Sequence, residues 1–125
     1  MKDKKFLIAE GSEDCSMLTQ TQLENIWVAK ENIIVVKNWT EALELVRKEL
    51  FDIIIISPKL AEIGGIDLAN QIKAEQKERS PKIIGSLTSP LEHENPFDAT
   101  VMKPQITEDL QKEILHVLMM SEKNN

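Results

Sequence analysis

Short runs of apolar, mostly β-branched residues recur along the chain, and segments with helical periodicity separate most of them. The runs occupy Phe6–Ala9, Ile33–Val36, Ile53–Ile56, residues 83–86 and residues 100–102. A strand that is buried on both faces has a nearly continuous apolar sequence, whereas a strand with one solvated face alternates. The pattern therefore predicts a parallel sheet whose two faces are both covered by helices.

The segments between these runs place apolar residues at helical spacing. We expect helices at residues 12–29, 39–50 and 66–76, and a final helix that begins at Thr107. Asn38 followed by Glu41 has the spacing of a capping box, which marks the start of the second helix. The pattern also predicts that Leu50 faces the core and that Trp27 and Trp39, which flank the second run, cover the edge of the sheet.

Five strands in alternation with helices predict a flavodoxin-like, doubly wound α/β fold with the strand order 2-1-3-4-5. The chain has 125 residues, and no linker rich in glycine, serine or proline divides it, so we expect a single domain over residues 1–125. Ligands of such folds bind at the edge formed by the carboxyl ends of the strands. The residues that directly follow the strands are therefore the first candidates for a functional site.

Charge and cysteine content argue against several classes of protein. The net charge is −6, and the cationic residues are interleaved with acidic ones, which argues against binding to a nucleic-acid backbone. Cys15 is the single cysteine, so no internal disulfide can form and a reducing compartment is favoured. The apolar run Phe6–Ala9 is too short for a signal peptide or a membrane span. We expect a cytoplasmic protein that binds neither nucleic acid nor membrane.

Polar residues and a Lys-Pro pair stand at the tips of four of the five expected strands. They are Glu10, Gly11, Ser57, Ser86, Lys103 and Pro104. Their order and spacing resemble those of response-regulator receiver domains, and the resemblance spans nearly the whole chain. Gly65 also fits a glycine of that family, whereas Leu60-Ala61 stands where the family often has a Met-Pro pair.

The resemblance implies a role for each strand-tip position. In receivers, two acidic residues after the first strand help hold Mg²⁺, and these positions correspond to Glu10 and Gly11. The aspartate that accepts the phosphoryl group corresponds to Ser57. The hydroxyl residue that follows the bound phosphoryl group corresponds to Ser86, and the Lys-Pro pair corresponds to Lys103 with its proline.

Two departures from the family remove the chemistry of phosphotransfer. Gly11 and Ser57 replace acidic residues, which leaves Glu10 as the only carboxylate at the matched positions. Mg²⁺ requires several oxygen ligands in near-octahedral order, so we predict that it binds poorly and that the protein has no cofactor. A serine hydroxyl is a poor nucleophile without a base, and no histidine lies near these positions in the sequence. We therefore expect no enzymatic activity.

The matched residues also have structural explanations, which we favour over functional ones. Lys103 would pair with Glu10 and fill the crevice with an ion pair. Ser86 would satisfy backbone groups, as hydroxyl residues at strand ends often do. Ser57 with Pro58 would simply end the strand, and Glu10 would be solvated.

The segment from Leu87 to Asp98, where receivers place their fourth helix, contains two prolines and has no helical periodicity. We predict that this helix is missing or reduced to a turn. In the family, the surface made by the fourth helix, fifth strand and fifth helix often carries the signal to partners, so its remodelling suggests a different or fixed partner surface. His93 is expected to be an exposed loop residue and not a metal ligand.

These observations favour a degenerate receiver, a phosphorylation-independent module of a two-component-type pathway that binds a signalling protein. One alternative is an unconventional phosphorelay receiver that uses another nucleophile. Asp52 is the nearest aspartate for that role, but it lies at the opposite end of the Ile53–Ile56 strand. Another alternative is a small-ligand sensor that uses Lys103 to hold an anion. The sequence leaves the partner, the choice between monomer and homodimer, and membership of a longer regulator open.

Overall fold

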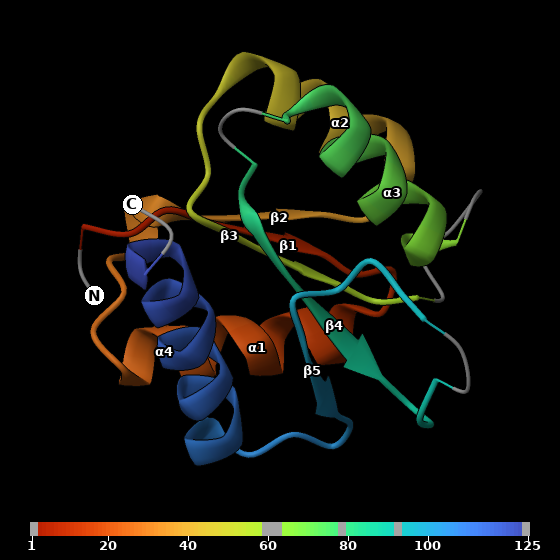
Figure 1. Ribbon diagram of the computed structural model, residues 1–125. Coiled ribbons are helices and arrows are strands. Elements are labelled where there is room, and N and C mark those ends of the chain that lie inside the picture. The colour runs from red at the N-terminus through yellow and green to blue at the C-terminus, as the bar shows by residue number, and fades with distance from the viewer. Residues whose placement is uncertain (1–2, 59–63, 78–79, 92–93, 124–125) are drawn as a thin grey trace.

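A five-stranded parallel sheet forms the centre of the protein, in the order β2-β1-β3-β4-β5. The computed structural model describes residues 3–58, 64–77, 80–91 and 94–123 (Figure 1). The strands are β1 (Phe6–Ala9), β2 (Ile33–Val36), β3 (Ile53–Ile56), β4 (Lys82–Leu87) and β5 (Ala99–Met102). This topology confirms the predicted flavodoxin-like fold. Leu60-Ala61 and His93 lie outside the described residues.

Two layers of helices cover the sheet, one on each face (Figure 1). The elements are α1 (Glu13–Asn25), α2 (Trp39–Lys48), α3 (Gly65–Glu75), α4 (Thr107–Lys123) and a single 3-10 turn at Lys30–Asn32. Side chains of a strand alternate between its faces. Ile53 and Ile55 therefore pack in the core under α1 and α4, whereas Ile54 and Ile56 pack in the core under α2 and α3. A run of four isoleucines suits this central strand because both of its faces are buried.

The second helix begins where the sequence predicts it. The Asn38 side chain accepts a hydrogen bond from the Glu41 backbone amide at 2.9 Å, as an N-cap residue does. The helix then ends at Lys48, so Leu50 lies beyond it and is 61% exposed. The prediction that Leu50 faces the core is therefore wrong, and the neighbouring Phe51 is the buried residue.

The first helix ends four residues earlier than predicted because Trp27 has a left-handed backbone, with φ of 72°. The Trp27 amide donates to the Glu24 carbonyl, and the Val28 amide donates to the Leu23 carbonyl, both at 3.1 Å. This pair of bonds is a Schellman motif, in which the left-handed position is usually glycine. Trp27 is 81% exposed, so the prediction that it covers the sheet is wrong, whereas Trp39 is half-buried against the core.

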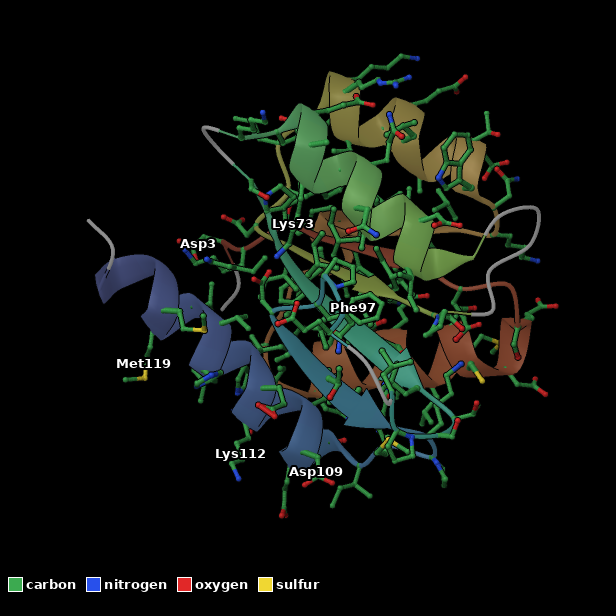
Figure 2. The ribbon with its side chains drawn as sticks, turned by 45° about the vertical axis from the view of Figure 1, so that its right-hand side comes forward. Asp3, Lys73, Phe97, Asp109, Lys112 and Met119 are labelled. Carbon is green, nitrogen blue, oxygen red and sulfur yellow. The ribbon has the colours of Figure 1, made fainter. Side chains whose placement is uncertain are left out.

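The connection between β4 and β5 has no helix in its described part, residues 88–91 and 94–98, as predicted. Phe97 packs against the middle of β4 in place of a helix, and Leu91 joins the same core (Figure 2). The ring lies so close to Gly85 that a Cβ added there would be 2.6 Å from a ring carbon. Gly85 therefore allows an aromatic ring from a loop to cover this part of the sheet.

Candidate functional site

The carboxyl edge of the sheet brings together the polar residues that the sequence places at strand tips. In a parallel sheet with aligned strands, residues that follow different strands emerge at one edge. β3 pairs with β1 on one side and β4 on the other, so Ser57 lies between the tips of those two strands. Glu10, Ser57 and Ser86 are 6%, 3% and 3% exposed, so the edge is a buried polar cluster and not an open crevice of solvated groups.

An ion pair occupies the centre of this edge. The Lys103 Nζ lies 2.6 Å from Glu10 Oε1 and 3.4 Å from Ser57 Oγ. The other Glu10 oxygen accepts a hydrogen bond from the Ser12 backbone amide at 3.1 Å. The predicted pairing of Lys103 with Glu10 is confirmed, but the expectation that Glu10 is solvated is wrong. A buried carboxylate needs such partners because an unpaired charge is costly away from water.

The start of α3 closely approaches the backbone at the end of β3. The Gly65 amide donates to the Pro58 carbonyl at 3.0 Å, and α3 begins at Gly65. A Cβ added at Gly65 would overlap the Ser57 carbonyl oxygen. Glycine is therefore required at this position for α3 to start directly behind Ser57.

The donor set at the strand tips does not fit Mg²⁺. Gly11 is exposed and offers no side-chain oxygen, and one oxygen of Glu10 is bound to the Lys103 ammonium group. A hard cation would need further carboxylate oxygens and would have to displace a positive charge. Across the ranges that the structure describes, no three His, Cys, Asp or Glu side chains are grouped as metal ligands.

A second buried network holds Ser86. Its hydroxyl donates to Gln105 Oε1 at 2.9 Å, and Gln105 Nε2 donates to Thr19 Oγ1 at 3.0 Å and to Gln22 Oε1 at 3.1 Å. Gln22 Nε2 returns a bond to the Gln105 carbonyl at 2.9 Å. Ser86 therefore bonds to a side chain and not to the backbone groups that we expected. The network connects β4 to α1 through Gln105.

Sequence reasoning missed Gln105, Thr19 and Gln22, although a signal for them exists. Ser16, Thr19 and Gln22 are spaced by three residues along α1 and are all buried, which marks a polar stripe on an inward face. A polar stripe that faces a core requires a polar partner. Gln105 supplies it.

The remaining sequence-predicted residues lie as follows. Pro104 is exposed and is joined to Lys103 by a cis peptide bond. Asp52 precedes β3, and its Oδ2 accepts a hydrogen bond from the Lys5 backbone amide at 2.8 Å. Asp52 therefore lies at the amino edge of the sheet, away from Ser57, as its sequence position indicated. In the described ranges no helix is long and apolar enough to span a membrane.

The fold is shared with solved receiver domains. The signal receiver domain of an HD domain-containing protein from Pseudomonas fluorescens Pf-5 is 18% identical with a TM-score of 0.83, over 99% of this chain and 93% of that one. A CheY-like receiver domain from Methanospirillum hungatei JF-1 is 22% identical with a TM-score of 0.81, over 98% of each chain. The receiver domain of a sensor histidine kinase from Pseudomonas aeruginosa PAO1, solved with magnesium in its active-site cleft, is 18% identical with a TM-score of 0.80, over 90% of this chain and 95% of that one.

Comparison of the sequence itself adds no closer assignment, since no protein-family model and no curated protein matches it. The likeness to the solved structures covers at least nine-tenths of this chain in each case above. The strand order β2-β1-β3-β4-β5 agrees with it. The chain therefore has the fold of response-regulator receiver domains.

Proposed function

We propose that the protein is a receiver-like signalling module of a two-component-type pathway that binds a protein partner without being phosphorylated. The observation that carries this proposal is the contact of Lys103 with both Glu10 and Ser57, at 2.6 Å and 3.4 Å. By the resemblance to receivers, this pair of a lysine and a buried carboxylate corresponds to positions that help hold a metal and a phosphoryl group in that family. The receiver fold is kept, and the Lys103–Glu10 ion pair takes the place of phosphotransfer chemistry at the strand tips.

The chemistry of Ser57 supports this reading. A serine hydroxyl needs a neighbouring base to act as a nucleophile. The side chain that contacts Ser57 is Lys103, which donates hydrogen bonds and is held by Glu10. A phosphate ester on serine would also lack the lability of the acyl phosphate on which switching of receivers depends. Ser57 is thus suited to packing and hydrogen bonding at the end of β3.

The alternatives gain less support from the geometry. A phosphorelay through Asp52 would place the nucleophile at the amino edge of the sheet, where its carboxylate caps the Lys5 amide. A ligand sensor at the strand tips would need Lys103 to be available to an anion, whereas its ammonium group is already paired with Glu10. Binding of a protein partner through a fixed surface requires neither a nucleophile at the amino edge nor a Lys103 that is available to an anion.

Phosphorylation is tested by incubating the protein with acetyl phosphate and Mg²⁺ and measuring its intact mass. We expect no gain of mass in the wild type, and a Ser57→Ala variant should likewise show no gain relative to its own untreated mass. A gain of one phosphate that is lost in Ser57→Ala would overturn the proposal. A gain that maps to Asp52 would support the phosphorelay alternative instead.

The expected poor binding of Mg²⁺ is tested by Mg²⁺ titration of two variants. Ser57→Asp alone restores one carboxylate, whereas Ser57→Asp combined with Gly11→Asp restores both positions at which receivers carry acids. Because Mg²⁺ needs several oxygen ligands, binding is expected in the double variant only. Equal affinity in the two variants, measured by calorimetry, would show that Gly11 is not the missing half of the site.

A further inference from the structure

An open surface cavity of about 290 Å³ lies at the amino edge of the sheet, opposite the strand tips. It is bordered by the end of α3, the start of β4 and the residue that precedes β5. Its lining residues are Lys73, Lys77, Ser80, Pro81, Lys82 and Asp98. Figure 2 shows Lys73 reaching from α3 toward the start of β4. Three ammonium groups thus border one small cavity in a protein whose net charge is −6.

Asp98, the carboxylate among the described lining residues, is already committed. Asp98 Oδ1 lies 3.0 Å from Lys73 Nζ, and Asp98 Oδ2 accepts the Ile83 backbone amide at 2.8 Å. Asp98 therefore neutralises Lys73 and caps the start of β4. Neither Lys77 nor Lys82 forms an ion pair with any residue in the described ranges.

Glu75, in the last turn of α3, is committed as well. Glu75 accepts hydrogen bonds from Arg47 Nε and Nη2, each at 2.7 Å, and from Gln71 Nε2 at 2.6 Å. These bonds hold Glu75 toward α2. Glu75 therefore does not neutralise the lysines of the cavity.

Local structure explains only part of this charge. The negative end of a helix dipole favours a lysine in the last turn, which accounts for Lys73. Lys77 follows the end of α3, and Lys82 belongs to β4. Ammonium groups that share a cavity repel one another, and an anion between them would remove that repulsion.

We propose that this cavity binds a small phosphorylated molecule, with Lys77 and Lys82 contacting the phosphate and the Ser80 hydroxyl adding a hydrogen bond. Lys77 and Lys82, which have no ion-pair partner among the described residues, carry a charge of +2, which matches a phosphate monoester at neutral pH. Lysine binds phosphate as a point charge with three donors. The volume is close to the lower end of the roughly 300–1,000 Å³ that ligand pockets span, so it suits a small metabolite.

This site does not depend on the proposed signalling role. It lies at the opposite edge of the sheet from Glu10 and Lys103, and no residue is shared between the two places. Loss of the cavity's lysines leaves the strand-tip contacts intact. The two proposals can therefore fail separately.

The test is a titration of ¹⁵N-labelled protein with inorganic phosphate and with glycerol 3-phosphate, followed by ¹H–¹⁵N spectra at constant ionic strength. We expect saturable shifts at the amides of Lys77, Lys82 and Asp98. Tighter binding of glycerol 3-phosphate would identify a phosphate ester as the ligand class, and equal binding would identify phosphate itself as sufficient. No saturable shift at the lining amides with either probe would overturn the proposal.

Variants separate the cavity from general attraction of anions to lysine. Lys77→Gln combined with Lys82→Gln should weaken binding by about tenfold or more, because two charge-assisted contacts are lost. Lys112→Gln, an exposed site on α4, should leave the affinity unchanged (Figure 2). The single change Ser80→Ala, with a smaller expected loss, serves if the double variant is poorly folded. Equal affinities in the wild type, the lysine variants and Ser80→Ala would refute the site.

Discussion

The two edges of the sheet differ in how their polar side chains are satisfied. At the carboxyl edge, Glu10 and Lys103 pair with each other, and Ser86 and Gln105 bond within a closed network. At the amino edge, three lysines border a cavity in which Asp98 is committed to Lys73 and to the backbone. The edge at which doubly wound folds usually bind ligands is therefore closed here, whereas Lys77 and Lys82 at the other edge have no ion-pair partner among the described residues.

Burial explains this difference. A charge that is removed from water needs a partner, because its desolvation otherwise costs several kcal/mol or more. The side chains of Lys103 and Glu10 are 16% and 8% exposed, so their pairing is required. Lys77 is exposed and Lys82 is half-buried, and water can solvate them when no anion is present. Charged side chains can therefore remain without a charged partner only where solvent reaches them.

Removal of the central cation should give the largest effect. Lys103→Met leaves Glu10 buried without its charged partner, and we expect a loss of about 3–5 kcal/mol in the free energy of unfolding. Lys112→Met on exposed α4 should change it by no more than about 0.5 kcal/mol. Urea denaturation measures both. A small loss for Lys103→Met would contradict the view that this pair stabilises the carboxyl edge. Recovery of the free energy of unfolding in the double variant Glu10→Gln with Lys103→Met would show that the loss comes from the unpaired carboxylate.

Disruption of the glutamine network should cost less. Gln105→Leu removes the acceptor of the buried Ser86 hydroxyl and the donor to Thr19 Oγ1 and Gln22 Oε1, and we expect a loss of about 2–3 kcal/mol. Gln71→Leu is the matched control, since Gln71 is exposed and its change should stay within about 0.5 kcal/mol. Thermal and urea unfolding measure both variants. Equal stability of the two would mean that the network at the carboxyl edge contributes nothing.

A stabilising change is expected at the amino edge, where α1 ends. Trp27→Gly relieves the left-handed backbone and should raise the free energy of unfolding by about 1 kcal/mol. Trp27→Ala removes the ring but keeps the strain, so it should differ little from the wild type. Melting temperatures of the three proteins test this. Destabilisation in both variants would show that the exposed ring makes contacts that hold this edge together.

The smallest effect concerns the exposed pair beside the lysine cavity. Hydrogen bonds from Arg47, and then from Gln71, lower the pKa of Glu75 from 4.5 to about 2. A lowered pKa in the folded state means that this pair's contribution to stability is present above pH 4.5 and is lost as pH falls through about 2. Its effect on stability is slight because the pair is solvated.

Arg47→Gln should raise the pKa of Glu75 toward its ordinary value, because the largest cause of the shift is removed. Gln71→Ala should leave most of the shift in place. Carboxyl titration by NMR measures the pKa in each variant. An unchanged pKa in Arg47→Gln would mean that Glu75 is held by other cations, including the lysines of the cavity, and would weaken the contrast between the two edges.

Prediction from the sequence succeeded where the signal is local. Continuous apolar runs located all five strands, and Asn38 located the start of α2. It failed at the ends of elements, where Trp27 takes a conformation that usually belongs to glycine and Leu50 falls outside the helix. Strand and helix periodicity is set by near neighbours, whereas the point at which a helix ends depends on single backbone angles.

The sequence by itself determined the order of the strands, the burial of both sheet faces and the gathering of Glu10, Ser57, Ser86 and Lys103 at one edge. These follow from periodicity and from the connection rules of doubly wound sheets. Only the tertiary structure decided which polar groups bond to one another. Gln22 meets Gln105 across 83 residues and Lys103 meets Glu10 across 93, so their partners depend on packing that no local pattern records.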